Sequence, residues 1–124
     1  MHKKRFVIQE HTTAEGIHWD LMLEEGEMLS TFRLDEMPSA ASRQEIRAEK
    51  IFDHPIRFLS YEGPVQQGTG RVRIVARGAY RCVGRSKEVL GLEFGGDTLQ
   101  GDFTLTHANE AVWALAPAKG PTPG

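Results

Sequence analysis

The chain has 124 residues, the size of one domain, and its 40% hydrophobic and 26% charged residues exclude a disordered or collagen-like protein. A formal net charge of −2 gives no strong field for attracting nucleic acid, although the basic residues 2–5 fit either a phosphate-contacting arm or a solvated terminus. The single cysteine, Cys82, excludes an intramolecular disulfide and a multi-cysteine zinc site. The sequence has no long apolar stretch and no signal peptide, which predicts a cytoplasmic protein without a membrane partner.

The first third of the chain predicts three strands. Arg5–Glu10 is short, apolar and rich in β-branched residues, which favours a strand. Ile17–Glu24 alternates with period two, with Ile, Trp and Leu on one face and His, Asp, Met and Glu on the other. Met28–Leu34 follows a turn at residues 25–27, so we expect it to form a hairpin with the preceding strand.

The next segment is the one helix candidate. Ser39–Lys50 has Pro38 and Ser39 as start signals and contains good helix formers. Its second half, from Ile46, is equally compatible with a strand. Asp53-His54-Pro55 ends whichever element precedes it, because a residue before proline is disfavoured in the α region.

The rest of the chain is divided by glycines into short runs. Many short strands at roughly ten-residue spacing are typical of an all-β sandwich or barrel. The last residues, 117–124, are rich in proline and glycine and predict a flexible tail. The expected strands of this part are Arg71–Ala76, Val89–Phe94, Gly101–Thr106 and Ala111–Leu115.

One pattern suggests a metal site. On a strand, His18 and Asp20 point to the same side while Trp19 packs behind them. If this face lines a barrel interior, its polar groups must be hydrogen-bonded, paired or coordinated. With His11 from the preceding segment, two imidazoles and a carboxylate suit manganese, zinc or iron. His54, stiffened by the following proline, is a candidate for proton transfer or a phosphate contact.

Simpler interpretations of these residues remain open. A histidine on a half-buried strand is commonly a hydrogen-bonded core residue or an exposed one, and the spacing of His18 and Asp20 is by itself a weak motif. His54 is equally compatible with a structural role in a turn. His2 and His107 have no acidic residue at a matching spacing, so we treat them as surface residues.

Eight short motifs follow one another along the chain: RFVIQEH at 5–11, HWDLMLE at 18–24, DHP at 53–55, EG at 62–63, GTG at 68–70, GLEF at 91–94, LQG at 99–101 and Trp113. In order and spacing they resemble the 3′-phosphoesterase domain of bacterial DNA ligase D, over nearly the whole chain. The resemblance implies a mainly β fold: a small closed or partly open antiparallel β-barrel with one or two short helices. It makes residues 1–116 a single domain and 117–124 its tail.

The resemblance also implies an activity. Members of that family use manganese to remove phosphates and ribonucleotides from DNA 3′ ends during repair. By position, His11, His18 and Asp20 would be metal ligands, and His54 would contact the scissile phosphate. Manganese is the expected metal, with zinc or cobalt as alternatives. The implied partners are nucleic acid 3′ ends and a separate ligase or other repair proteins, because the chain has no Lys-x-Asp-Gly motif for ligation.

Two departures from the family pattern leave the activity open. Met22 stands where the family has an arginine on the face of the aspartate, and Phe58 stands where a tyrosine is expected. The loop between His11 and His18 is one residue longer than usual, and the glycine-rich loop is shorter. Two phosphate contacts are therefore missing. The candidates for a replacement charge are Arg33, Arg71 and Arg73.

Three functions remain: an end-trimming enzyme, which Met22 and Phe58 would weaken; a non-catalytic DNA-end or metal-binding module of a repair assembly; and a β-barrel for an unrelated metabolite, with structural histidines.

Overall fold

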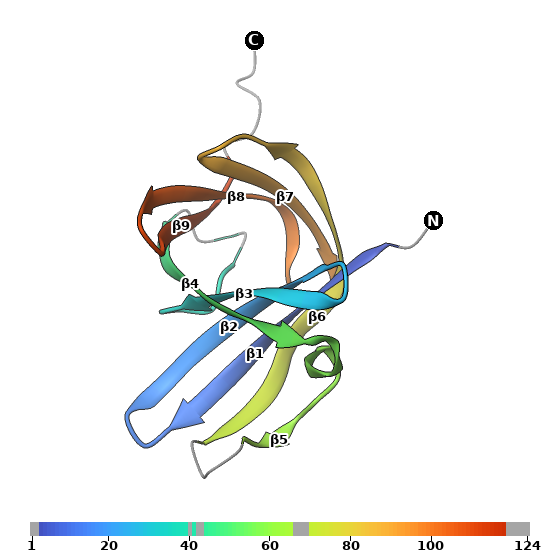
Figure 1. The fold of residues 1–124 in the computed structure, drawn as a ribbon, viewed down its shortest axis with the longest axis vertical. Helices are drawn as coiled ribbons and strands as arrows, with labels where there is room; N and C mark the ends of the chain where they lie inside the picture. Colours follow the sequence, from blue (N-terminus) through green and yellow to red (C-terminus); the bar gives the residue numbers. More distant parts are fainter. Residues whose placement is uncertain (1–2, 40, 42–43, 66–69, 119–124) are drawn as a thin grey trace.

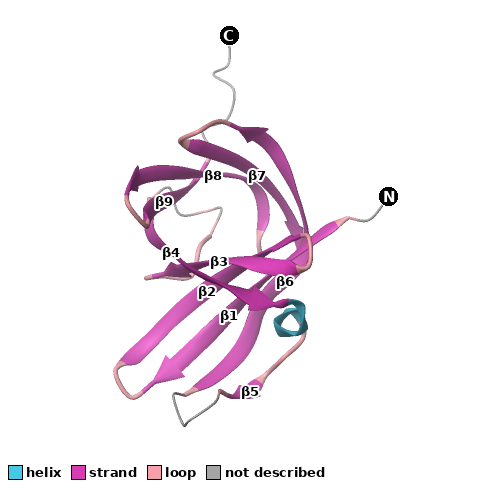
Figure 2. Ribbon diagram, in the orientation of Figure 1, coloured by secondary structure: helices cyan, strands magenta, loops and turns pink. Residues whose placement is uncertain are grey.

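The computed structural model describes residues 3–39, 41, 44–65 and 70–118, and almost all of its regular structure is β. Nine strands and one short 3-10 helix follow one another along the chain, and Figure 2 shows the dominance of strands. In order they are β1 (Lys4–Thr13), β2 (Gly16–Glu25), β3 (Met28–Leu34), β4 (Ile46–Pro55), η1 (Ile56–Leu59), β5 (Gly63–Pro64), β6 (Arg71–Arg85), β7 (Val89–Gly96), β8 (Gln100–Asn109) and β9 (Val112–Pro117).

The strands form a closed antiparallel barrel, as the family resemblance implies. Eight of them pair in the order β1-β2-β3-β4-β9-β8-β7-β6, and β6 pairs with β1 to complete the ring, while β5 adds to the edge of β6. The long strand β6 pairs with β1 through its first part and with β7 through its second part. In Figure 1 the β1–β2 hairpin and the start of β6 therefore extend below the ring.

The interior of the barrel is one apolar cluster. All eight strands of the ring contribute buried side chains to it, including Phe6, Leu21, Phe32 and Leu115. Burial of this apolar surface is the main favourable contribution to folding. A second, smaller cluster lies on the opposite face of the first three strands, where Val7, Met22 and Leu29 pack against the residues of η1. Both faces of β2 are therefore covered.

The two faces of β2 correct one expectation. Trp19, Leu21 and Leu23 contact the interior cluster, so the opposite face, with His18 and Asp20, lies outside the barrel. The condition considered from the sequence, that this polar face lines the barrel interior, is therefore not met. A strand with period-two alternation directs only one of its faces to the barrel core, and here the larger apolar side chains occupy that face.

The predicted helix over Ser39–Lys50 is wrong for the described residues of that range. Ile46 begins β4, which confirms the alternative interpretation of this segment, and residues 40, 42 and 43 lie outside the described residues. Ile46 and Ala48, on either side of the exposed Arg47, are buried in the core, because β4 pairs with β3 on one side and β9 on the other. This tertiary pairing overrides the local helix propensity. The described helical structure is limited to η1.

Both ends of the domain are tied into the barrel. Lys4 forms an ion pair with Glu25 and Arg5 one with Glu24, so these basic residues of the predicted arm lie in β1 and contact β2. At the other end, β9 includes Pro117, and the amide of Ala118 donates to the Asp102 carbonyl. The remaining residues of the predicted tail, 119–124, lie outside the described residues. Among the described residues, none of the helical structure is long and apolar enough to cross a bilayer.

Candidate metal and phosphate site

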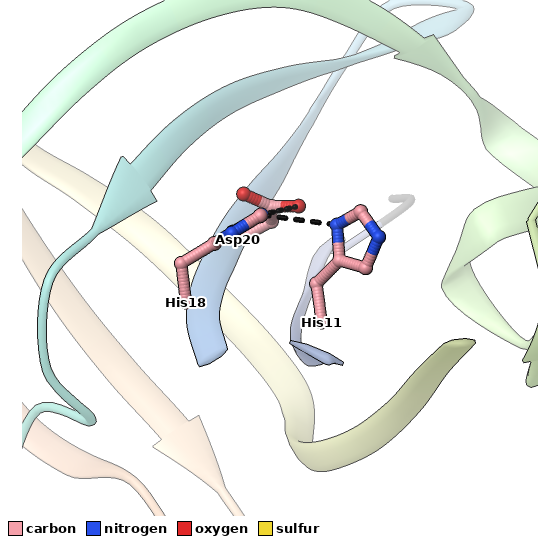
Figure 3. A group of neighbouring side chains, drawn as sticks. All are labelled: His11, His18 and Asp20. Atoms are coloured by element: carbon pink, nitrogen blue, oxygen red, sulfur yellow. Dashed lines mark hydrogen bonds and ion pairs between the residues drawn. The ribbon is translucent and has the colours of Figure 1, made fainter. Parts of the chain in front are cut away.

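The first hairpin brings the two histidines together. The β1–β2 turn pairs Thr13 with Gly16, and this register places His11 directly opposite His18. Directly opposed residues in an antiparallel pair project from the same face, so the two imidazoles meet. The Nδ1 atom of His11 lies 3.0 Å from the Nε2 atom of His18, and the rings pack edge to face. Figure 3 shows the side chains approaching from the two strands.

Asp20 completes the cluster from β2. Its Oδ2 atom lies 3.5 Å from the Nε2 atom of His18, two positions earlier on the same face. The side chain is almost fully buried, and its Oδ1 atom is buried without a hydrogen-bond partner among the described residues. A buried carboxylate oxygen without a partner is costly, so this group is suited to a cation.

The three side chains fit a small divalent cation. One donor atom from each of His11, His18 and Asp20 lies within 4.8 Å of the others. Ligands at right angles around an ion with bonds of about 2.1 Å are about 3.0 Å apart, close to the spacing of the nitrogens here. Two imidazoles and one carboxylate leave further coordination positions open, as in catalytic sites. The structure therefore brings together the three residues that the sequence predicted as ligands.

His54 lies near the end of β4, close enough to Asp20 and Arg33 for their charges to act on its pKa. Its Nδ1 atom is 3.1 Å from the Phe52 carbonyl, an acceptor, so Nδ1 carries the hydrogen and the Nε2 of the neutral ring has a free lone pair. The ring stacks on Phe52 and meets Phe58 edge on. Burial lowers the pKa of His54 below its ordinary value, while the bond to Phe52 and the charge of Asp20 oppose this effect. The neutral form therefore dominates at neutral pH.

The two family departures occur in one place. Met22 is 1% exposed, and it packs with Val7 and Leu29 in the cluster that also includes Phe58 of η1. The two positions at which the family resemblance implies an arginine and a tyrosine thus hold apolar side chains in one packed cluster between β2 and η1.

The structure distinguishes the three candidate arginines. Arg33 lies opposite Asp20 in the β2–β3 register, and its Nε atom is 3.7 Å from the Asp20 Oδ1 atom. Arg73 forms an ion pair with Glu10 at 3.0 Å. Arg71 starts β6 and pairs with Thr12 at the edge of the hairpin. Of these three arginines, Arg33 is therefore the one in contact with the predicted metal ligands.

Two residues near the site, Gln9 and Glu62, make contacts that were not predicted from the sequence. Gln9 is buried in the outer face and donates to the carbonyls of Phe58 and Tyr61, which fixes η1 against β1. Glu62 accepts a hydrogen bond from the Ile74 amide at the register shift in the β1–β6 pairing. Both lie within quoted motifs, RFVIQEH and EG, whose contribution is to position the site.

Gly70 supports the site through its backbone. Its φ angle is +116°, and a Cβ atom there would collide with the Thr12 carbonyl oxygen and lie 3.2 Å from the His11 Nε2 atom. Only glycine adopts this conformation without strain and permits such an approach. The last residue of the GTG motif therefore lies directly against the first histidine. His107, by contrast, bonds to Glu88 and the Glu110 carbonyl, and His2 lies outside the described residues.

The comparisons with known proteins agree on one family. The family model described as the DNA Ligase D 3′-phosphoesterase domain matches residues 9–107. The chain is 29% identical to the multifunctional non-homologous end joining protein LigD of Pseudomonas aeruginosa over 129 residues, which cover 93% of this chain and 15% of that protein. It is 34% identical to the protein of the same name from Mycolicibacterium smegmatis over 64 residues, covering 52% of this chain and 8% of that protein.

The chain thus corresponds to a small part of these two relatives. The range matched by the family model nevertheless includes β2 and η1 together with the second half of β1, and it contains His11, His18, Asp20 and His54. With this match over most of its length, the chain belongs to the DNA ligase D 3′-phosphoesterase domain family.

Proposed function

We propose that this protein is a metal-dependent phosphoesterase that removes a 3′-phosphate or a 3′-terminal ribonucleotide from DNA ends during repair. The observation that carries the proposal is the convergence of His11, His18 and Asp20 beside His54. Family membership supports the reaction class, and the name shared by the two relatives supports end joining as the setting. A separate ligase, or other repair proteins, would use the trimmed end.

The three ligand candidates would hold a divalent ion, for which manganese is the leading candidate and zinc or cobalt are alternatives. A bound ion would supply positive charge to the phosphate oxygens as negative charge develops on them. Asp20 contributes the negative charge of the ligand set. His11 and His18 would each coordinate through a ring nitrogen that carries no hydrogen.

His54 would move the proton. In the hydrolysis of a 3′-phosphate, the oxygen of water forms a new bond to phosphorus and the bond from phosphorus to the sugar oxygen breaks. The leaving oxygen takes up a proton, while the attacking water releases one to solvent. The neutral ring of His54 would first bind a proton from solvent at Nε2 and then deliver it to the leaving oxygen, while the hydrogen bond from Nδ1 to the Phe52 carbonyl holds the ring. The products are a 3′-hydroxyl and inorganic phosphate.

The proposal is tested by incubating a 3′-phosphate-terminated DNA primer with the protein and manganese. We expect release of phosphate that stops when a chelator is added and is lost in His18→Ala. His107→Ala is the matched control, because the hydrogen bonds of His107 are made with Glu88 and Glu110, neither of which is a candidate ligand. Equal phosphate release by the wild-type protein and His18→Ala would refute the assigned site.

A second candidate function rests on Met22 and Phe58. Their apolar packing removes two expected phosphate contacts, and this loss favours a non-catalytic module that binds a DNA end or a metal within a repair assembly. Such a protein would bind 3′-phosphate DNA with manganese, zinc or cobalt and would turn over with none of them. Turnover with any of these metals decides for the enzyme.

A further inference from the structure

A positive charge stands beside the candidate metal site on the neighbouring strand. The β2–β3 register places Arg33 opposite Asp20, and the Arg33 Nε atom approaches the Asp20 Oδ1 atom at 3.7 Å. This distance is too long for a hydrogen bond. Both atoms are buried and lack hydrogen-bond partners among the described residues. The two groups therefore attract each other electrostatically while their hydrogen-bonding capacity stays available.

The Arg33 side chain also reaches solvent. It is 41% exposed although its Nε atom is buried, so the exposed surface belongs to other atoms of the side chain. A guanidinium has five donors in a planar fork that matches two phosphate oxygens. In the described part of the chain, Asp20 is the one carboxylate that lies within ion-pair distance of Arg33. The exposed N–H donors of the Arg33 guanidinium are thus available to a ligand that approaches from solvent.

The charges around Asp20 indicate what that ligand is. With neutral imidazoles, one carboxylate faces one guanidinium and, in the loaded site, one divalent cation. This arrangement leaves two positive charges. A terminal phosphomonoester carries close to two negative charges at neutral pH, whereas a phosphodiester carries one. The site is therefore balanced by a terminal phosphate and only partly balanced by a diester.

The second cluster makes β3, and not β2, the strand that can supply a positive charge to a ligand. The side chain at position 22 packs against Val7, Leu29 and η1, so this position does not present a charged group. Arg33 lies one strand away, opposite the aspartate that precedes Met22 by two positions. A guanidinium from β3 can consequently approach the same carboxylate while the apolar cluster remains intact.

We propose that Arg33 is the phosphate-binding arginine of this protein and that it selects DNA ends with a terminal 3′-phosphomonoester. The inference rests on the proposed function and names the residue that binds the terminal phosphate of the substrate. It assigns to this chain a contact from β3 in place of the one that the family pattern has at position 22.

Binding to an end that cannot be hydrolysed tests this role without relying on turnover. The probe is a fluorescent DNA with a 3′-methylenephosphonate end, in which carbon replaces the bridging oxygen, compared with the same DNA ending in a 3′-hydroxyl. Affinities are measured by anisotropy in manganese. We expect Arg33→Met to reduce the preference for the phosphonate end by about tenfold to a hundredfold, as for loss of a charge-assisted contact. Arg33→Lys should be intermediate, since it keeps the charge and loses the fork.

The matched control is Arg81→Met. Arg81 is also paired with one carboxylate, Glu93, but it lies in the part of β6 that pairs with β7. This variant should keep the full preference. Manganese titration gives a second readout: Arg33→Met should bind manganese at least as tightly as the wild type, because a positive charge next to Asp20 is removed.

The possible failures can be told apart. If Arg33→Met keeps the preference for the phosphonate end while the wild type releases phosphate from 3′-phosphate DNA, this inference is wrong and the proposed function stands. Weaker manganese binding by Arg33→Met would also overturn it, because Arg33 would then act by supporting the ligand set. If the wild type shows neither the preference nor phosphate release, the proposed function fails as well.

Discussion

Met22 of β2 and Phe58 of η1 belong to one apolar cluster on the outer face of the barrel. Each stands at a position where the family resemblance implies a polar side chain, and both positions share one apolar environment. An arginine at position 22 would place its charge among Val7 and Leu29, and a tyrosine at position 58 would offer its hydroxyl as a hydrogen-bond partner for that charge. As it stands, the cluster therefore suits apolar side chains at both positions.

Restoring only the family's arginine should consequently damage the protein. Met22 is 1% exposed, so Met22→Arg buries a charge without a partner and should lower the free energy of unfolding by about 2–4 kcal/mol. Urea denaturation measures this loss. Val83→Arg, at a position that is 53% exposed, makes a comparable change and should be nearly neutral. Adding Phe58→Tyr to Met22→Arg should recover part of the loss. A stable Met22→Arg protein with raised phosphate release would contradict this account.

The strand pattern of this chain could be read from sequence because period-two alternation is local. His18 and Asp20 had to share a face of a strand, and they do. The choice of interior or exterior could not be read in the same way. Met22 makes the polar face partly apolar, and η1, which covers it, comes from a segment more than thirty residues later.

The position of Arg33 depended on one residue of turn length. A three-residue turn at 25–27 would place Phe32 opposite Asp20, whereas the observed pairing of Glu25 with Met28 leaves Gly26 and Glu27 as the turn and places Arg33 there. The φ angle of Gly26, +61°, suits a two-residue hairpin turn with glycine first. The Gly26-Glu27 sequence is thus the local signal from which the register of the β2–β3 hairpin could be predicted. The approach of Gly70 to His11 is long-range and had no local signal.

Metal binding should be visible as stabilisation of the folded protein. An ion that binds only the native state at a hundred times its dissociation constant adds about 2.7 kcal/mol to the free energy of unfolding. We expect manganese to raise the melting temperature of the wild type and to leave His18→Ala and Asp20→Asn unchanged. His107→Ala should respond like the wild type. An equal manganese shift in the wild type and Asp20→Asn would exclude Asp20 as a ligand.

The pKa of His54 predicts a pH dependence of stability. Because burial lowers this pKa in the folded protein, the unfolded chain binds a proton more readily as the pH falls below its ordinary value of 6.5. The contribution of the neutral ring is thus complete above that value and is lost as pH falls through the lowered pKa. His54→Asn keeps a donor for the Phe52 carbonyl but does not titrate. Its unfolding free energy in EDTA should therefore fall less than that of the wild type between pH 7 and 5. Parallel curves would show that His54 is not the titrating group.

Gly70→Ala separates backbone strain from a collision at the metal site. The substituted residue would have to keep a φ angle of +116°, and its methyl group would meet the Thr12 carbonyl and the imidazole of His11. Gly101→Ala has the same kind of strain at +107° and open space around the added methyl. Urea denaturation should show a loss of about 1–3 kcal/mol from strain in both variants, and a larger loss in Gly70→Ala. Only Gly70→Ala should also weaken manganese binding, because moving β1 displaces the His11 ligand atom. If Gly101→Ala weakened manganese binding as much, the contact between Gly70 and His11 would have no special role.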